Sequence, residues 1–239
     1  MPPHTEAGVS LKGIHPDLEA VLEAAARLQE LVPDAVLVGG SAAALYAHHR
    51  LSYDHDHVVK DLRDRFDIVL EAIESAPDWV TNRVTPGKIV LGEIGDIEAG
   101  VRQLIRTTPL ETHQVTLRSG RSVTVPTADE TLRVKAFLIV RRNQVRDYID
   151  VAALSDTYGT DHASVVLANV DDYYADHTTA GHPVASQLVR QLGTVRPRDT
   201  STLERLDAYK DLDERWADWG NVTEVCGDLA ARMVERGVR

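Results

Sequence analysis

The alternation of apolar and polar positions predicts a chain whose first half mixes helices and strands. Apolar residues that recur every three or four positions indicate amphipathic helices, and short apolar or alternating runs between turn residues indicate strands. The expected elements, in order, are a helix at 15–31, a strand at 35–38, a helix at 41–49, a strand at 54–59, a helix at 62–75, and strands at 79–84 and 88–94. A mixed sheet flanked by helices should result.

The second half is expected to be mainly helical. It opens with a predicted hairpin at 112–126 and two consecutive helices at 128–142 and 144–158, and continues as helices interrupted at glycine and proline residues. The expected fold class is therefore α/β (α+β). We expect two regions, a sheet-containing core over 1–127 and a helical region over 128–239.

Composition narrows the class of protein. The 43% hydrophobic content is ordinary for a globular chain, no apolar run is long enough to cross a membrane, and the first residues lack a signal-peptide pattern. We therefore expect a cytoplasmic protein without a membrane partner. Cys226 is the only cysteine, which excludes an intramolecular disulfide.

The net charge of −11 argues against a protein that grips long duplex nucleic acid through a broad basic surface. Arginines nevertheless gather locally, and they could meet a triphosphate or an RNA backbone. The alternative is a solvated face in an arginine-rich sequence. The arginines concerned are Arg141, Arg142, Arg146, Arg190, Arg196 and Arg198.

A glycine-rich turn lies between an expected strand and an expected helix. Gly39-Gly40 follows the apolar run 36–38, and Ser41 opens an alanine-rich helical segment. Backbone N–H groups at a helix start, together with the Ser41 hydroxyl, can hold phosphate oxygens without a side-chain cation. Gly40 and Ser41 are therefore candidate phosphate ligands. The lysine of a P-loop does not follow them.

Two acids occupy the next expected strand. Asp54 and Asp56 are one residue apart, so their carboxylates should project from the same face. Like charges this close repel unless a cation lies between them, and Mg²⁺ prefers a few carboxylates together with substrate phosphates. We predict that Asp54 and Asp56 bind Mg²⁺, with Mn²⁺ as the alternative ion, in a site that acts on nucleotides.

The order and spacing of these motifs resemble a known family. Gly40-Ser41, His49-Arg50 and Asp54-x-Asp56 resemble the motifs of the nucleotidyltransferase superfamily, and within it the AbiEii/AbiGii and MenT-type toxins of type IV toxin–antitoxin systems. A second block, Lys135 within an apolar helix and then Arg146-Asp147-x-x-Asp150, looks like the family's lysine helix and Arg-Asp-x-x-Asp helix. The likeness covers about residues 31–160.

The resemblance implies a nucleotidyltransferase-like fold and a Mg²⁺-dependent enzyme. Such an enzyme transfers a nucleoside monophosphate from a nucleoside triphosphate to an acceptor hydroxyl, with the 3′ end of a tRNA as the implied acceptor and an antitoxin as the implied partner. The family motifs place the triphosphate at Gly40, Ser41, Arg50, Lys135 and Arg146, and the catalytic groups at Asp54, Asp56, Lys135, Asp147 and Asp150.

Alternatives remain open at several of these residues. Lys135 lies in an apolar helical run and needs an anion, which could be the triphosphate or an internal carboxylate, Asp147 or Asp150. Either aspartate could instead be a third catalytic carboxylate, because the two share a helix face. The residues that compete for that role are Glu93, Asp96 and Glu98.

Two other functions are weighed against nucleotidyl transfer. The first is a scaffold that binds nucleotide or RNA without turnover. The second is a metal-dependent phosphohydrolase, in which imidazoles hold a transition metal that activates water. On a strand, however, His55 and His57 should face away from the aspartate pair. The histidines that suggest this second function are His48, His49, His55 and His57.

Overall fold

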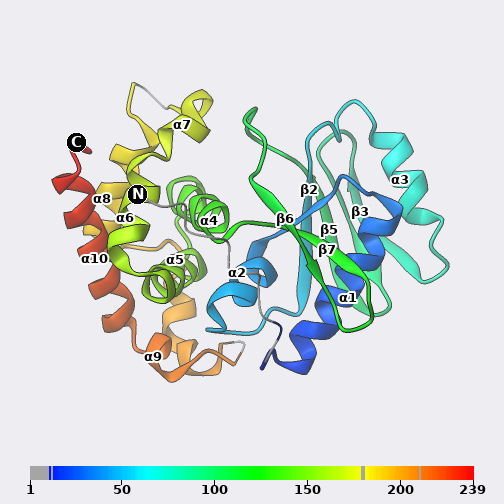
Figure 1. The fold of residues 1–239 in the computed structure, drawn as a ribbon, viewed down its shortest axis with the longest axis horizontal. Coiled ribbons are helices and arrows are strands. Elements are labelled where there is room, and N and C mark those ends of the chain that lie inside the picture. The colour runs from blue at the N-terminus through cyan, green and yellow to red at the C-terminus, as the bar shows by residue number, and fades with distance from the viewer. Residues whose placement is uncertain (1–10, 12, 179–180, 210) are drawn as a thin grey trace.

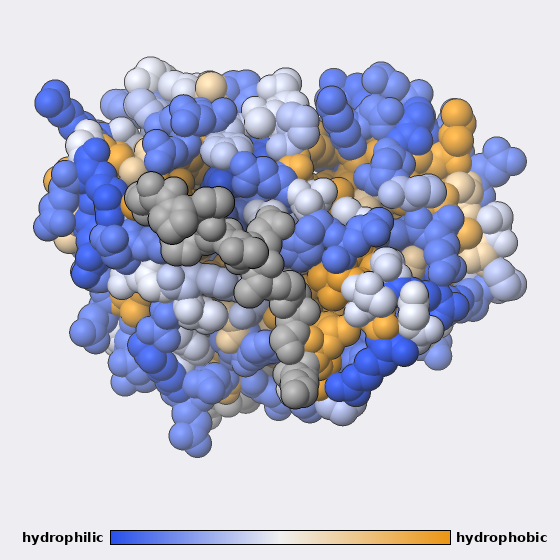
Figure 2. Space-filling model, viewed as in Figure 1, coloured by the Kyte–Doolittle hydropathy of each residue, from blue (hydrophilic) through white to orange (hydrophobic). Residues whose placement is uncertain are grey.

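The protein consists of a sheet-containing half and a helical half that lie side by side (Figure 1). The structure is a computed structural model, and it describes residues 11, 13–178, 181–209 and 211–239. The surface on the face of Figure 1 is largely hydrophilic, in keeping with the net charge of −11 (Figure 2).

A five-stranded mixed sheet forms the first half, in the order β1-β2-β5-β4-β3. Its strands are β1 (Val36–Val38), β2 (Asp54–Val59), β3 (Trp79–Thr85), β4 (Ile89–Ile94) and β5 (Ile97–Gln103). The β2–β5 pair is parallel, and the other three pairs are antiparallel. The expectation of a mixed sheet is confirmed.

Two helices cover one face of this sheet, α1 (Pro16–Leu31) and α3 (Phe66–Glu74). Helix α1 begins at Pro16, a residue that suits a first helical position, and the His15 ring accepts a hydrogen bond from the Asp17 N–H. Leu28 of α1 and Val69 of α3 join Val101 of β5 in one buried cluster. The other face of the sheet is therefore left to face the helical half.

A third helix and a hairpin complete the first half. Helix α2 (Gly39–Ala47) follows β1 directly, and strands β6 (Thr112–Thr116) and β7 (Ser122–Pro126) pair as an antiparallel hairpin at the place predicted. The Gln29 side-chain amide bonds to both the N–H and the C=O of Thr124, at 2.7 and 2.9 Å, and so attaches the hairpin to α1.

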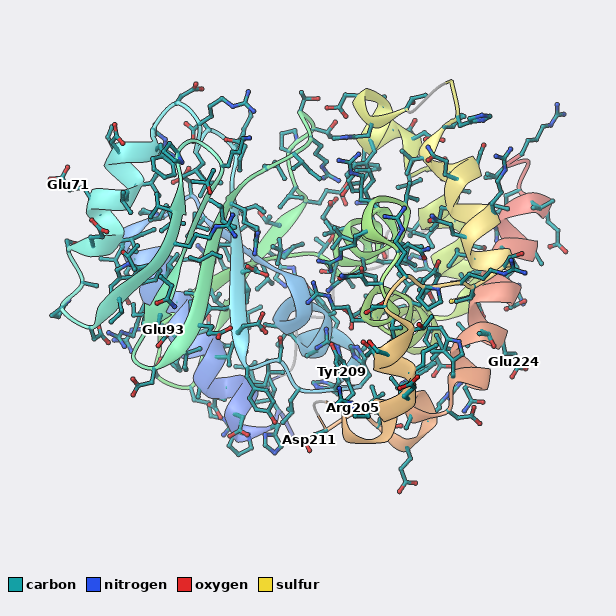
Figure 3. The ribbon with its side chains drawn as sticks, turned by 180° about the vertical axis from the view of Figure 1, so that it is seen from behind. Glu71, Glu93, Arg205, Tyr209, Asp211 and Glu224 are labelled. Carbon is teal, nitrogen blue, oxygen red and sulfur yellow. The ribbon has the colours of Figure 1, made fainter. Side chains whose placement is uncertain are left out.

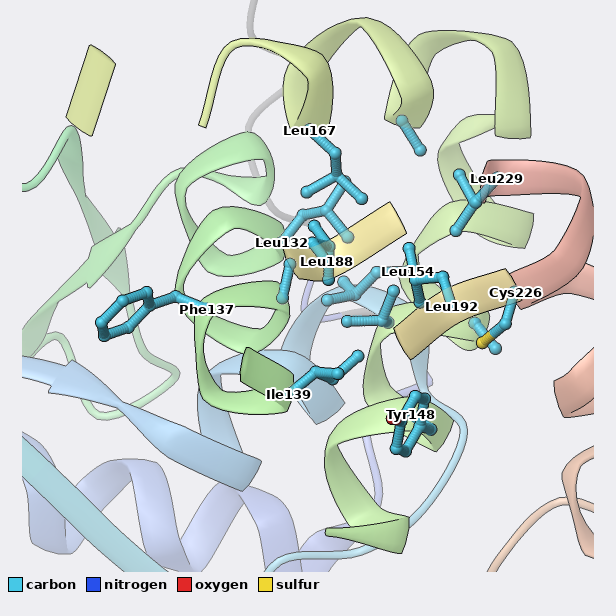
Figure 4. Packing of buried hydrophobic residues seen from close by; sticks show 14 of the residues in the cluster. Leu132, Phe137, Ile139, Tyr148, Leu154, Leu167, Leu188, Leu192, Cys226 and Leu229 are labelled. Carbon is cyan, nitrogen blue, oxygen red and sulfur yellow. The ribbon is translucent and has the colours of Figure 1, made fainter. Parts of the chain in front are cut away.

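The helical half begins at Thr127, whose side chain accepts a hydrogen bond from the Glu130 N–H at the start of α4. Its elements are α4 (Ala128–Arg142), α5 (Val145–Tyr158), α6 (Thr160–Ala168), α7 (Asp171–Tyr174), the 3₁₀ helix η1 (Ala175–His177), α8 (Val184–Gly193), the 3₁₀ helix η2 (Thr200–Ala208), α9 (Glu214–Ala217) and α10 (Trp219–Glu235). Their apolar faces form one buried cluster (Figure 4). Ala43 and Tyr46 of α2 belong to that cluster, so α2 joins the two halves.

Two elements differ from the sequence-based prediction. Helix α3 begins at Phe66 rather than at 62, because the chain turns first and the Asp61 carbonyl accepts hydrogen bonds from the N–H groups of Asp64 and Arg65. No strand was predicted at 97–103, where β5 lies between β2 and β4. Gly100, at its centre, has low strand propensity and obscures the pattern.

Candidate functional site

A cavity of about 720 Å³ lies between the free face of the sheet and the helical half. Figure 3 shows side chains of both halves converging there. Strands β2, β4 and β5 supply one wall, and α4 with the start of α5 supplies the other. The lining residues on which the site depends are Gly39, Gly40, Arg50, Asp54, Asp56, Glu98, Arg102, Lys135, Arg142, Arg146 and Tyr209.

Asp54 and Asp56 both project into this cavity. Burial alternates along β2, so Asp54 and Asp56 are partly accessible while His55 and His57 are buried behind them. The Ser52 hydroxyl donates to Asp54 Oδ1 at 2.9 Å, and Arg102 Nε donates to Asp56 Oδ1 at 3.2 Å. The two acids therefore share one face, as their spacing predicts.

Gly100 on the neighbouring strand β5 makes room for the Asp56 carboxylate. Gly100 of β5 is in register with Asp56, and a Cβ atom at Gly100 would lie 2.4 Å from Asp56 Oδ1. Any side chain at position 100 would thus displace the carboxylate, which explains a glycine in the middle of a central strand.

A third acid joins this face from β5. Glu98 is in register with Asp54 in the parallel pair and lines the cavity. Of its two competitors, Glu93 accepts a hydrogen bond from Asn82 at 2.9 Å, and Asp96 occupies the turn before β5 with φ of 66°. Neither Glu93 nor Asp96 lines the cavity. Glu98 is therefore the third carboxylate that the geometry favours.

The carboxylates suit a hard divalent cation. Asp54 and Asp56 present oxygen ligands at the wall of an open cavity, and Mg²⁺ commonly takes one or two protein carboxylates plus phosphate and water oxygens. Within the described ranges, no three acidic, imidazole or thiol side chains converge as a ready-made metal site. Substrate phosphates would have to complete the coordination, as the prediction for Asp54 and Asp56 assumed.

The glycine turn has the expected shape, but Ser41 does not have the expected orientation. Gly39 adopts φ of +81°, which a residue with a side chain rarely takes, and Gly39 and Gly40 line the cavity. Ser41 is fully buried and its hydroxyl donates to the backbone carbonyl of Asp54. The expectation that the Ser41 hydroxyl holds phosphate is corrected here, because that hydroxyl instead ties α2 to β2.

A buried ion cluster lies beside the turn, centred on Asp150. Lys135 Nζ lies 2.6 Å from Asp150 Oδ2, and Arg50 donates to both carboxylate oxygens at 2.8 and 3.0 Å. His49 Nε2 lies 2.7 Å from Asp150 Oδ1. All four side chains are at most 5% exposed. For Lys135 the geometry thus agrees with the internal ion pair rather than with a cation that is free for triphosphate.

Asp150 is not placed as a catalytic carboxylate. Burial alone would raise its pKa, but the charges of Arg50 and Lys135 hold the pKa of Asp150 well below its ordinary value. One carboxylate lies between the basic side chains of Arg50 and Lys135, so the cluster carries a positive excess next to the aspartate pair. Arg50 also supports the turn, because a Cβ atom on Gly40 would lie 2.8 Å from Arg50 Nη2.

Asp147 is likewise engaged, whereas Arg146 is not. Arg142 donates to both oxygens of the fully buried Asp147 at 2.6 Å. Arg146 lines the cavity, and among the described residues it has neither an ion pair nor a hydrogen-bond partner for its buried Nε. A buried polar atom without a partner costs free energy, so Arg146 is the side chain best placed to receive an anion.

Apolar side chains also line the cavity. Val58 and Leu91 line it from the sheet, Leu104 lines it from the segment after β5, and Val134 and Leu138 line it from α4. Val134, Leu138 and Arg142 are spaced four residues apart along α4, so a single face of that helix passes from apolar to cationic. The cavity can therefore accept a ligand with a flat apolar part and an anionic part.

The histidines behind β2 do not build a hydrolytic metal site. His55 and His57 are fully buried on the face that packs against α1 and α3, and their Nδ1 atoms are 3.5 Å apart. Burial lowers the pKa of His55 to about 4 and that of His57 well below its ordinary value. Both rings point away from Asp54 and Asp56, so the imidazole–carboxylate arrangement is not formed.

Tyr209 is a cavity residue that the sequence did not indicate. It follows η2 in the last third of the chain, and burial raises its pKa. The segment after it contacts the loop that precedes β2, because Asp211 accepts a hydrogen bond from Tyr53 at 2.9 Å and the Asp213 N–H donates to the His49 carbonyl. No local motif marks Tyr209, since a tyrosine in a polar stretch is common on any surface.

Known proteins resemble the chain at the level of sequence and of fold. A candidate nucleotidyltransferase from H. pylori superposes with a TM-score of 0.54 over 92% of this chain and 94% of its own, at 15% identity. JHP933 from Helicobacter pylori superposes with a TM-score of 0.51 over 92% and 91%, also at 15% identity. At such identities the likeness concerns the fold alone.

A third relative is similar in sequence. "Heme uptake protein MmpL11" of Mycobacterium tuberculosis (strain ATCC 25618 / H37Rv) is 30% identical over 92% of this chain, but the match covers only 23% of that protein. The chain thus spans less than a quarter of the length of the curated relatives it matches. In the described part of the chain, no helix has the length and apolar character needed to cross a bilayer. The predicted cytoplasmic location stays a prediction.

The match to a protein family covers most of the chain. Residues 20–221 match the model described as "Nucleotidyl transferase AbiEii toxin, Type IV TA system". This range includes the glycine turn, the aspartate pair, the Asp150 cluster and Tyr209. The chain therefore belongs to the family of AbiEii nucleotidyltransferase toxins of type IV toxin–antitoxin systems.

Proposed function

We propose that this protein transfers a nucleoside monophosphate from a nucleoside triphosphate to an acceptor hydroxyl, in a Mg²⁺-dependent reaction. The observation that carries the proposal is the cavity itself, in which Asp54 and Asp56 face an unpaired Arg146 across one space. By family resemblance, the acceptor is the 3′ end of a tRNA and the biological partner is an antitoxin that restrains the toxin.

Different groups of the protein bind the triphosphate, the nucleobase and the metal ion. The triphosphate lies along the Gly39-Gly40 amides and Arg146, and the positive excess of the Asp150 cluster adds to the field there. The nucleobase contacts apolar side chains of the lining, among them Leu104 and Leu138. Asp54 and Asp56 hold the ion, which neutralises phosphate charge when bound.

The proposed reaction forms one bond and breaks one bond at the α-phosphorus, and it transfers one proton. The acceptor oxygen attacks the α-phosphorus, the bond from that phosphorus to the bridging oxygen of the β-phosphate breaks, and pyrophosphate leaves. Glu98 receives the proton of the attacking hydroxyl, because it lies on the same face as the aspartates. Arg146 stabilises the charge on the departing pyrophosphate.

Incubation of the purified protein with α-labelled nucleoside triphosphates, Mg²⁺ and total RNA tests this proposal. We expect label to appear in tRNA with the wild type and to disappear with Asp56→Asn, while both proteins give the same circular dichroism spectrum. Asp64→Asn is the matched control, because it makes the same chemical change at an exposed carboxylate beyond the end of β2.

Other outcomes would identify other functions. Release of free nucleoside monophosphate without labelled RNA would establish a phosphohydrolase. Binding of nucleotide with neither product would establish a scaffold without turnover. Label that persists in Asp56→Asn would contradict the role assigned to the aspartate pair.

A further inference from the structure

Exposed arginines gather where α4 meets α5, beside Arg142 and Arg146, which line the cavity. Asn143 separates the two helices in a left-handed conformation. Its carbonyl accepts a hydrogen bond from the Arg198 N–H, and its side-chain amide donates to the Arg196 carbonyl, both at 2.8 Å. The segment that carries Arg196 and Arg198 is therefore fixed against the helix junction that carries Arg141 and Arg146.

A fifth arginine joins this group from η2. That helix packs against α5, and Tyr209 at its end lines the cavity. Figure 3 labels Arg205 beside Tyr209, on the helical side of the space between the two halves. Arg141, Arg196, Arg198 and Arg205 are all exposed.

These arginines differ from most other arginines in the protein in their ion pairing. Elsewhere arginines are neutralised, for example Arg27 by Asp78 and Arg118 by Glu19. Among the side chains that the structure describes, which do not include those of residues 207 and 208, these four arginines have no carboxylate partner. The acids at the junction are occupied, since Asp147 binds Arg142 and Asp199 accepts from the Val145 N–H at 2.8 Å.

We propose that Arg141, Arg196, Arg198 and Arg205 form a docking surface for the sugar–phosphate backbone of an RNA, next to the end that enters the cavity. This inference rests on the proposed function and assigns the residues on which its acceptor docks. Several guanidinium groups without partners in a protein of net charge −11 concentrate positive potential in one place. Guanidinium forks match phosphate oxygens in geometry, and the spread of these four over two helices and one loop suits a chain of phosphates rather than one.

The test measures how the affinity for RNA depends on salt concentration, in the absence of nucleotide. Fluorescence anisotropy of 5′-labelled bulk tRNA gives the dissociation constant at NaCl concentrations from about 50 to about 200 mM. Each lost phosphate contact should lower the slope of log affinity against log salt by about 0.7, so the triple variant Arg196→Ala, Arg198→Ala, Arg205→Ala should lower it by about 2.

The controls separate this surface from general electrostatics and from the proposed function. Arg118→Ala also removes a positive charge, but from a guanidinium that already pairs with Glu19, so the salt slope should not change. Calorimetry of Mg²⁺–nucleoside triphosphate binding should give equal affinity for the wild type and the triple variant. If the wild type binds nucleotide but not tRNA, the surface fails and nucleotidyl transfer to another acceptor stands.

Two further results would overturn the inference. One is a triple variant that keeps the wild-type salt slope. The other is a wild type that binds polyglutamate in place of tRNA, which would assign the arginines to an acidic protein partner. Retained tRNA binding in a protein that does not bind nucleotide would support the surface and refute the proposed function.

Discussion

Removal of the carboxylate at the centre of the buried cluster should destabilise the fold strongly. In Asp150→Asn, Arg50 and Lys135 keep their charges, yet both side chains are at most 5% exposed and lose the carboxylate that pairs with both. Removal of one partner from a buried ion pair costs about 3–5 kcal/mol. For a chain of this length, about 2–4 °C in melting temperature corresponds to 1 kcal/mol, so the loss should be about 6–20 °C.

A second substitution makes this prediction specific. Lys135→Met, added to Asp150→Asn, removes one of the two stranded charges and should restore about 1–3 kcal/mol of the free energy of unfolding. Urea and thermal unfolding followed by circular dichroism measure all four proteins of the cycle. Asp64→Asn, at an exposed carboxylate, should stay within about 0.5 kcal/mol of the wild type.

Either of two results would refute this prediction. An Asp150→Asn protein within 1 kcal/mol of the wild type would mean that water or a rearranged partner replaces the carboxylate at little cost. Strictly additive losses for Asp150→Asn and Lys135→Met would mean that the two side chains do not interact in solution, contrary to their 2.6 Å contact.

Three further predictions concern pH, the sheet and the nucleotide. Because burial lowers the pKa of His55 from 6.5 to about 4, only the unfolded chain binds its proton between those values, so this ring alone should cost about 3 kcal/mol of stability from pH 6.5 to 4. The pKa of His57 shifts in the same direction, so unfolding titrations should show at least that loss, and a flat profile would refute the burial of the two rings. Gly100→Ala should reduce transfer about 100-fold because its Cβ displaces Asp56, whereas Gly227→Ala, with open space around its Cβ, should leave turnover unchanged; equal turnover in both variants would exclude the displacement. Arg146→Ala should weaken nucleotide binding about tenfold or more in calorimetry without lowering the melting temperature, and undiminished affinity would place the phosphates elsewhere.

Local patterns predicted the parts of the site that are encoded within a few residues. The Asp54-x-Asp56 spacing implies a shared face on any extended strand, and the same alternation sends His55 to the buried side. The glycine turn before α2 is also a short-range feature, because Gly39 can adopt the positive φ that the turn requires.

Local sequence patterns did not predict contacts between residues that are far apart in the chain. Whether Lys135 meets triphosphate or carboxylate was left open, and the contact of Lys135 with Asp150 depends on how α4 packs against α5. Ser41 was expected to point at phosphate, but the proximity of β2 to α2 gives its hydroxyl the Asp54 carbonyl. The last third of the chain matched no motif, yet it supplies Tyr209.

By itself, the sequence determined the glycine turn, the common face of Asp54 and Asp56 and, except for β5, the order of helices and strands as far as α5, because each depends on backbone geometry over a few residues. Only the tertiary structure decided that Glu98 is the third acid of the cavity, since the parallel pairing of β2 with β5 joins segments 44 residues apart. It also decided that Asp150 neutralises Arg50 and Lys135, because a buried charge takes whichever counter-ion the packing brings within reach.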